Sequence, residues 1–366
     1  MNQYPVIFLT FKNIDGLNFQ RAYDQLVYEI GSLFEEHSYL TDCEQLSENE
    51  RQMFRKLQNQ QASEVEISRS LQLLLQIMNK YYGKQVILLL DEYDVPLAKA
   101  STNNYNEQML EIIKTMMATA LKDNSNLKFA IITGCLKISK ESIFTGTNNF
   151  VSDTISSTRL NEYFGFLDEE VDSLYQIYQE TTRKPKISRQ ELREWYDGYS
   201  TAAGDYLYNP RSVICALRDN QLANYWTSSG TYDSIFTYIK GNIADVRNDL
   251  VFMVSGEKVP ARIQQYAATA NELHTKDQIY SAMVVYGLLT YEDGKVFIPN
   301  KELMEKFDEL LLSNQNLGYV YRLAKESARM LQATLHGDTD TMEEILEYVH
   351  DTEVPIYSYN NEVEKF

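Results

Sequence analysis

The chain has 366 residues, with 34 Lys and Arg against 52 Asp and Glu, so its formal net charge is −18. With 44% hydrophobic and 12% aromatic residues, the composition is that of a globular protein and excludes a disordered or fibrous chain. At roughly 100 to 200 residues per domain, the length predicts two or three domains, each with a core of its own.

The sequence has no segment long enough to cross a membrane as a helix. Its strictly apolar stretches, such as residues 86–90, are far shorter than the roughly 20 residues that a span requires. The N-terminal sequence MNQYPVIFLTFK also lacks the basic region and cleavage site of a secretory signal. We therefore expect a cytoplasmic protein without membrane contact.

Cysteine and histidine are too few and too scattered to predict a metal site. Cys43, Cys135 and Cys215 form no CxxC pair, and the four histidines do not cluster with them. A sequence pI near 4.7 argues against broad, nonspecific nucleic-acid binding, because the overall field repels phosphate backbones. The remaining possibility for nucleic-acid binding is a local basic patch.

The first third of the chain alternates between buried strands and helices. Residues 4–11 form a continuous apolar run, which predicts a core parallel strand buried on both faces. Residues 18–82 carry apolar side chains at helical spacing, and Gly83 is a plausible helix stop. A second buried strand follows at residues 86–90.

The same alternation continues beyond the second strand. Apolar residues between Met109 and Leu121 fall on one helix face, and residues 129–134 predict a third strand. Strand, helix, strand, helix, strand is the pattern of a doubly wound α/β domain.

The rest of the chain is mainly helical. DEEVDSLYQIY and RQELREWYDGY, which closes at Gly198, predict a helical lid or linker. A helix at 279–289, a hairpin around Asp293-Gly294 and the helix KELMEKFDELLL together resemble a winged-helix module. The expected domains are an α/β core at 1–164, a lid at 165–230, a winged-helix-like region at 231–315 and a helical tail at 316–366.

The second strand ends in the acidic pair Asp91-Glu92, which is the Walker B pattern. In such sites the Asp holds Mg²⁺ and the Glu polarises the attacking water. Alone the pattern is weak, because buried strands commonly run out into acidic turns. Thr133 ends the next strand, where related ATPases keep a polar residue that senses the γ-phosphate; a hydroxyl bonded to the backbone at a strand end is the alternative.

A phosphate-binding loop of the form G-x-x-x-x-G-K-[ST] does not occur in the sequence. Gly198 and Gly204 have the spacing, but Asp205 stands where the Lys is required and no strand precedes them. The sequence therefore offers acidic residues for a metal without a cradle for phosphates.

Several blocks in order resemble the AAA-ATPase-like family of predicted bacterial ATPases, which usually carry a restriction-endonuclease-like nuclease module at the C-terminus. The matching blocks run over most of residues 4–304. They are YPVIFLTFKNIDG, YYGKQVILLLDEYDVPL, LKFAIITGCLKISKESIFTGTNNF, EYFGFLDEEV, WYDGY, YNPRSV and YGLLTYEDGKVFIPNKEL. The resemblance implies a P-loop NTPase-like parallel sheet, with ATP and Mg²⁺ as cofactors. It assigns Asp91 to metal and cofactor binding, and Glu92 and Thr133 to catalysis.

Departures from the family pattern lie at both ends. Family members typically begin with a P-loop of the RPRRFGKT type upstream of the YPVIFLTF strand, and continue after a YNNE-type element into the nuclease; this sequence starts at Met1 and stops at Phe366. In this class the strand before the P-loop lies next to the strand that carries Thr133. We therefore expect an incomplete sheet with an unpaired edge, and either reduced stability or self-association.

A further departure is at residues 167–168, where Leu-Asp replaces the usual Thr-Glu capping pair, so that the lid helix loses its hydroxyl cap.

Three functions stay open. The first is a member of the ATPase family, inefficient as this chain alone, and the second is a non-catalytic regulatory or interaction protein derived from it. The third is DNA binding through the winged-helix-like region, which charge disfavours: Glu302, Glu305, Asp308 and Glu309 make its last helix acidic, and a protein contact fits better.

Three basic residues are candidate phosphate contacts, although ordinary surface positions fit them better: Lys137, Lys140 and Arg159. The WYDGY segment fits a packing corner better than a ligand site.

Overall fold

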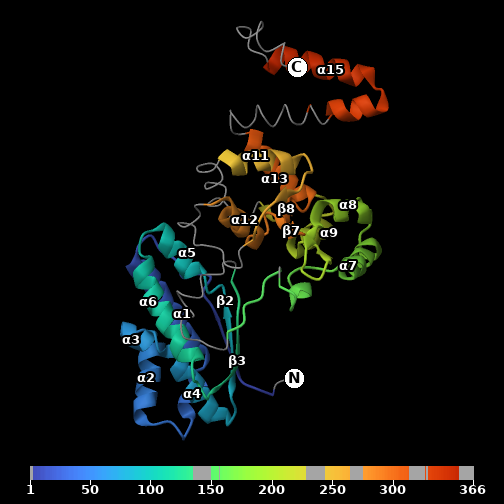
Figure 1. Ribbon diagram of the computed structural model, residues 1–366. Helices are drawn as coiled ribbons and strands as arrows, with labels where there is room; N and C mark the ends of the chain where they lie inside the picture. Colours follow the sequence, from blue (N-terminus) through green and yellow to red (C-terminus); the bar gives the residue numbers. More distant parts are fainter. Residues whose placement is uncertain are drawn as a thin grey trace. The chain divides into compact units, whose positions relative to one another are not determined.

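The computed structural model describes residues 3–134, 150–155, 157–227, 244–263, 275–312, 326 and 329–353 (Figure 1). Contacts divide the chain into two compact units. The first comprises Met1–Ser152 with Gln265–Leu273, and the second comprises Asp153–Gln264 with His274–Phe366. Each unit is described below by itself.

The first unit is the α/β domain that the alternating pattern predicts. Its described elements are β1 (Val6–Thr10), α1 (Phe19–Glu36), η1 (Ser38–Asp42), α2 (Glu48–Gln58), α3 (Glu64–Ile67), α4 (Ser70–Tyr82), β2 (Val86–Asp91), α5 (Val95–Thr102), α6 (Asn106–Leu121) and β3 (Leu127–Ile132). Helix α4 ends at Gly83, whose φ of +62° is the left-handed conformation of a helix stop. The three expected strands are thus confirmed.

The three strands form one parallel sheet in the order β1-β2-β3. Thr10 of β1 pairs with Asp91 of β2, and Leu90 pairs with Ile132 of β3. Parallel strands that are joined through helices end at the same edge of their sheet. Strand β3, which leads to Thr133, lies at the outside of the sheet that the described strands form.

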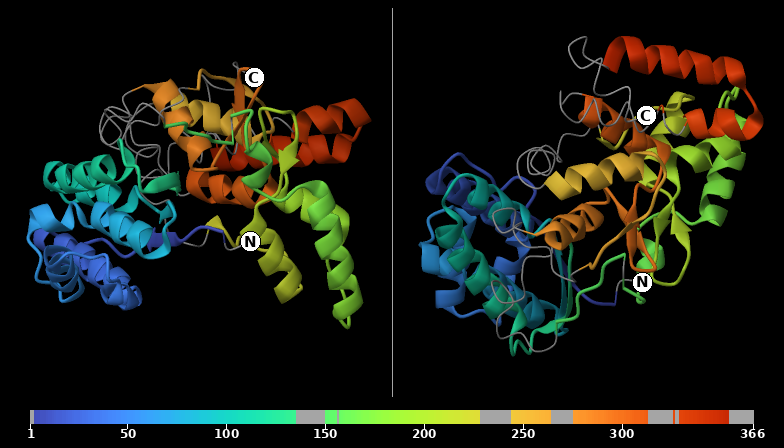
Figure 2. Two further views of the ribbon diagram at one scale, coloured as in Figure 1. Left: turned by 90° about the horizontal axis from the view of Figure 1, so that it is seen from below. Right: turned by 45° about the horizontal axis from the view of Figure 1, so that its top comes forward.

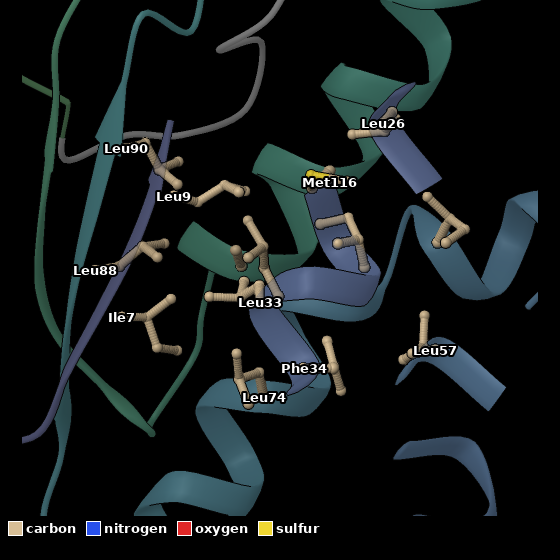
Figure 3. Close-up of a cluster of buried hydrophobic side chains, with 14 of the residues drawn as sticks. Ile7, Leu9, Leu26, Leu33, Phe34, Leu57, Leu74, Leu88, Leu90 and Met116 are labelled. Carbon is tan, nitrogen blue, oxygen red and sulfur yellow. The ribbon is translucent and has the colours of Figure 1, made fainter. Parts of the chain in front are cut away.

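Helices cover one face of the sheet and form the core of the first unit. Figures 1 and 2 show α1, α4 and α6 on this side. Ile7 and Leu9 of β1 and Leu88 and Leu90 of β2 point toward them (Figure 3). The helical partners include Leu33, Phe34, Leu74 and Met116. Truncating such a buried leucine to alanine typically costs about 2–5 kcal/mol, so this layer holds the unit together.

The opposite face of the sheet is exposed, and the prediction of strands buried on both faces is wrong on this point. Val6 and Phe8 of β1 are 42% and 56% exposed, and Phe129 and Ile131 of β3 are 46% and 52% exposed. A continuous apolar run is compatible with burial on both faces of the strand. It does not show whether a second layer of helices covers the other face of the sheet. No helix among the described residues buries this face.

The second unit contains short helices and two small antiparallel sheets. Its described elements are η2 (Asn161–Tyr163), α7 (Asp168–Thr181), α8 (Arg189–Tyr196), β4 (Tyr199–Ser200), β5 (Tyr206–Leu207), α9 (Pro210–Asp219), α11 (Ala244–Val254), β6 (Val259–Pro260), α12 (Lys276–Val285), β7 (Thr290–Glu292), β8 (Lys295–Phe297), α13 (Lys301–Leu312) and α15 (Thr339–Glu353). Strands β4 and β5 form one ribbon, and β6, β8 and β7 form a three-stranded sheet in that order.

Local capping explains where the first helices of this unit begin. Ser188 caps α8 and Asn209 caps α9 through side-chain oxygens. Helix α7 starts after Leu167, which has no such oxygen; Glu170 Oε2 instead accepts a hydrogen bond of 2.9 Å from the Leu167 amide. The predicted loss of the hydroxyl cap is therefore confirmed, and half of the capping box remains.

The expected hairpin is present between α12 and α13. Asp293 and Gly294 have φ values of +48° and +79°, as a two-residue turn of type I′ requires. Strand β6 adds a third strand that the sequence pattern did not indicate.

Two motifs in the second unit have structural roles. Gly198 of WYDGY has φ +116°, and a Cβ there would collide with the Pro299 carbonyl, so this turn packs against the chain just before α13. Glu302 corrects the expectation of an acidic helix face, because its side chain is fully buried. Ser212 Oγ donates to it at 2.8 Å and the Trp226 amide donates at 2.7 Å. Helix α13 therefore buries Glu302, whereas Glu305 and Asp308 are partly exposed and Glu309 is exposed.

No described helix is both long and apolar enough to cross a membrane.

Candidate functional site

Three polar side chains meet where the strands of the parallel sheet end. Thr10 ends β1, Asp91 ends β2 and Thr133 follows β3 directly. Side chains alternate between the two faces of a strand, so these three residues lie on the same face as the exposed Phe8 and Ile131 and the half-buried Leu89. They form a polar row at the carboxyl end of the exposed face.

Both carboxylate oxygens of Asp91 accept hydrogen bonds from this row. Thr133 Oγ1 donates to Asp91 Oδ1 at 2.6 Å, and Thr10 Oγ1 donates to Asp91 Oδ2 at the longer distance of 3.4 Å. Main-chain bonds fix the strand ends: the Thr133 amide donates to the Leu90 carbonyl at 2.8 Å, and the Phe11 amide donates to the Asp91 carbonyl at 2.9 Å. The carboxylate is thus held in place by neutral hydroxyls.

Glu92 begins the turn that leads out of β2. Its φ of +53° is a left-handed conformation, which costs a residue with a Cβ roughly 1–2 kcal/mol. The turn is held by the Tyr93 amide, which donates to the Thr133 carbonyl at 3.1 Å, and by the Val95 amide, which donates to the Glu92 carbonyl at 3.1 Å. Strain of this kind is retained where the surroundings impose it, and it is common at functional sites.

The next two residues anchor the acidic turn in the fold. Tyr93 and Asp94 are 7% and 3% exposed, and Asp94 precedes α5. Gly134 packs directly on both: a Cβ at this position would lie 2.7 Å from the Tyr93 ring and would collide with Asp94 Oδ1. Tyr93 and Asp94 are therefore packed into the fold, whereas Asp91 and Glu92 keep part of their surface open.

The structure brings two of the three predicted site residues into direct contact, Asp91 and Thr133, and places Glu92 next to them in the chain. Thr10 is the residue that sequence reasoning missed. Its signal is indirect, because only the register of β1 against β2 shows that it lies beside Asp91. The Thr133 hydroxyl also approaches the Leu90 carbonyl at 3.4 Å, so the backbone-bonded alternative describes part of its environment.

The polar row fits a metal ion better than it fits phosphate. Mg²⁺ takes oxygen ligands, usually one or two carboxylates completed by water and substrate phosphates. Among the described residues no three His, Cys, Asp or Glu side chains cluster, so an all-protein metal cage is not formed in that part of the chain. Asp91 with two neighbouring hydroxyls therefore suits a metal ion that is also coordinated by a nucleotide. The sequence contains no Gly-Lys-Thr loop that would bind the phosphates of that nucleotide.

Only one of the three candidate cations for phosphate lies among the described residues. Arg159 forms an ion pair with Asp153 in the second unit. Lys137 and Lys140 lie outside the described residues. An open hollow of about 480 Å³ does occur in the first unit, but Asp15, Gly16, Leu17, Arg21, Asp24 and Gln25 line it, and none of the polar row does.

Comparison with known proteins places the polar row inside a recognised family segment. Residues 1–144 match the AAA-ATPase-like family, which is described as a predicted AAA-ATPase. The chain is also 27% identical over 150 residues to a protein of Azotobacter chroococcum mcd 1 that is described as an uncharacterized protein in the vnfD 5′ region. That alignment covers 41% of this chain and 28% of the relative. No solved structure matches the chain.

Proposed function

We propose that the first unit carries the metal-binding half of an ATPase site, in which Asp91 binds Mg²⁺, Glu92 orients the attacking water and Thr133 contacts the γ-phosphate. The observation that supports this most directly is the polar row of Thr10, Asp91 and Thr133 at the carboxyl edge of a parallel sheet. Ligands of open α/β sheets bind at that edge. The family match over residues 1–144 favours ATP as the nucleotide.

The hydrogen bonds indicate which oxygen of Asp91 would take the metal. Asp91 Oδ1 is occupied by the short bond from Thr133, while Oδ2 accepts only the 3.4 Å bond from Thr10. Oδ2 is therefore the oxygen that is easier to release. A bound Mg²⁺ would supply charge neutralisation at the phosphates. Glu92, in the turn that follows, is the carboxylate available to accept a proton from water.

Phosphate binding is the half that the sequence does not provide. Main-chain amides and a lysine normally surround the β- and γ-phosphates, and the sequence contains no such loop. We therefore expect this chain by itself to bind Mg²⁺–ATP weakly and to hydrolyse it inefficiently. Derivation from a cytoplasmic bacterial ATPase fused to a nuclease, with the second unit as lid and winged-helix-like region, is part of the same proposal.

A second candidate function is a non-catalytic regulatory or interaction protein of the same ancestry. The exposed apolar face of the sheet favours it, because such a face is usually covered in a parallel sheet. The two candidates differ in whether Asp91 still binds a metal–nucleotide complex.

Isothermal calorimetry with Mg²⁺–ATP separates these candidates. We expect binding with a Kd on the order of 0.1–1 mM, at least about tenfold weaker in Asp91→Ala and absent when EDTA removes the metal. Asp24→Ala, which removes an exposed carboxylate from α1, is the matched control and should bind as the parent does. Equal binding by Asp91→Ala, or no heat at millimolar ATP from a folded sample, would leave only the non-catalytic candidate.

A further inference from the structure

The face of the sheet opposite the helices carries two complete rows of apolar side chains. We call these six residues the bare face. They are Val6, Ile87 and Phe129 in one row, and Phe8, Leu89 and Ile131 in the next. The pairing register puts one residue from each strand into each row. The bare face is therefore continuous across all three strands and made only of apolar side chains.

Exposure of the bare face is uneven, and it is greatest on the outer strands. Phe8 is 56% exposed and Ile131 is 52% exposed, whereas Ile87 and Leu89 of the central strand are half-buried. Large apolar side chains spread over three strands in this way offer on the order of 400 Å², which is in the range of patches that mark interaction sites. An isolated surface leucine is ordinary, whereas a registered patch of this size is often an interaction site.

Charged residues border the bare face at its two ends, with opposite signs. At the amino ends of the strands, Lys128 Nζ lies 5.4 Å from the centre of the Tyr4 ring, and the exposed Lys84 donates to the Gln3 carbonyl. At the carboxyl ends stand Asp91 and Glu92, whose two negative charges outnumber the single positive charge of the exposed Lys12 just after β1. From the rise per residue of a parallel strand, the Cα atom of Asp91 lies about 13 Å beyond the row that contains Ile87.

We propose that the bare face is the docking surface for a second copy of this chain, with the two sheets packed face to face about a two-fold axis that runs across the strands. Such an axis reverses the strand direction between copies, so the lysine end of each face meets the acidic end of the other. The charge pattern is thus complementary to itself, as an isologous interface requires. This inference does not depend on nucleotide binding.

The size of the bare face sets the strength of the dimer. Two such faces bury on the order of 800 Å² together, below the roughly 1,200 Å² of the smallest standard interfaces. The dimer is therefore weak, and it forms at tens of micromolar rather than at nanomolar concentration. The net charge of −18 on each copy adds a general repulsion, which weakens the dimer further.

Sedimentation equilibrium of the full chain between about 1 and 200 µM tests the proposal. The mass should rise from the monomer value of 42.5 kDa toward twice that value. Phe129→Ser with Ile131→Ser should hold the chain at the monomer mass throughout. Val65→Ser, at a 66% exposed position on α3, is the matched control and should associate as the parent does. Circular dichroism checks that each variant is folded. The proposal is overturned if the parent stays monomeric over this concentration range, or if the folded double variant still associates.

A charge exchange tests the two-fold arrangement itself. Lys128→Glu brings two carboxylates together at both contacts of a homodimer, and Asp91→Lys brings two ammonium groups together, so each variant alone should associate at least about tenfold more weakly. In an equimolar mixture of the two variants, the heterodimer pairs the introduced carboxylate at position 128 with the introduced ammonium group at position 91 in one contact, and Asp91 with Lys128 in the other. The mixture should therefore associate more strongly than either variant alone. Lys128→Glu combined with Asp91→Lys restores opposite charges at both contacts of a homodimer and should recover dimerisation. A double variant that associates no better than the single variants would contradict the antiparallel arrangement.

Discussion

Asp91 and Glu302 are held in contrasting ways, and the contrast bears on the metal-binding role proposed for Asp91. Asp91 remains partly exposed at a strand end and accepts two hydroxyl hydrogen bonds. Glu302 is fully buried and accepts hydrogen bonds from Ser212 Oγ and from the Trp226 amide. A carboxylate that a metal or water can reach must keep part of its surface open. Only Asp91 meets that condition.

Glu92 gives a prediction about strain at the site. Glycine adopts its φ of +53° without the cost that a Cβ imposes, so Glu92→Gly should raise the free energy of unfolding by about 0.5–1 kcal/mol while removing the proposed water-orienting carboxylate. Glu92→Ala removes the same carboxylate but keeps the Cβ. Urea unfolding of the two variants measures the difference, and equal stability would show that the turn stores no strain.

The site could be predicted from sequence only in part. Asp91 and Glu92 follow directly from an apolar run that ends in an acidic pair, a one-dimensional pattern. The contact of Thr133 with Asp91 requires that β3 lie beside β2, and the role of Thr10 requires the register of β1 against β2. Register depends on tertiary packing, which spacing along the chain does not reveal.

Helix α13 offers a test of how one buried carboxylate joins separate elements. Glu302 links α13 to α9 through Ser212 and to the loop before residue 228 through Trp226. Glu302→Ala would remove the acceptor of both donors and should lower the free energy of unfolding by about 3 kcal/mol. Glu302→Gln retains an acceptor for the Trp226 amide and a donor for Ser212, so it should be far better tolerated. Urea unfolding of the two variants checks this, and equal losses would show that an amide cannot replace the carboxylate in these two hydrogen bonds.

The same residue gives the pH dependence. Burial raises the pKa of Glu302 above its ordinary value of 4.5, so the folded chain holds this proton more tightly than the unfolded chain does. The contribution of Glu302 to stability therefore increases as pH falls from neutrality through the raised pKa, and it is lost as pH rises through it. The free energy of unfolding of Glu302→Gln minus that of the parent should therefore be larger at about pH 7.5 than at about pH 5. Glu305→Gln is the control, and the same pH trend in both variants would refute this assignment.

At the scale of elements, sequence predicted the strands and helices of the first unit well but not the covering of its sheet. A continuous apolar run locates a strand, but it gives no two-residue alternation that would tell a covered face from an open one. Val6 and Phe8 are as apolar as the buried Ile7 and Leu9, so composition does not distinguish the bare face from the core. What covers a face is decided by other segments or other chains, and that information is not local.

At the scale of the whole molecule, charge opposes the use of the hairpin and α13 for DNA binding. The chain carries a net charge of −18, and the basic residues of α13 have contacts within the protein: Lys301 Nζ lies 4.9 Å from the centre of the Trp195 ring, and Lys306 pairs with Glu309 at 3.6 Å. DNA affinity arises mainly from lysine and arginine that neutralise phosphates and release counterions. Neither the overall field nor this helix supplies such a surface.

We therefore expect no binding to a short fluorescent DNA duplex in anisotropy measurements at about 50 mM salt, with protein up to about 10 µM. Low salt is the sensitive condition, because phosphate contacts strengthen steeply as salt is removed. The concentration is kept below that of the proposed self-association, so that a dimer does not mask the result. Anisotropy that rises at about 50 mM salt and falls again at about 200 mM would reveal a local basic patch, and the winged-helix-like region would then become a DNA-binding candidate.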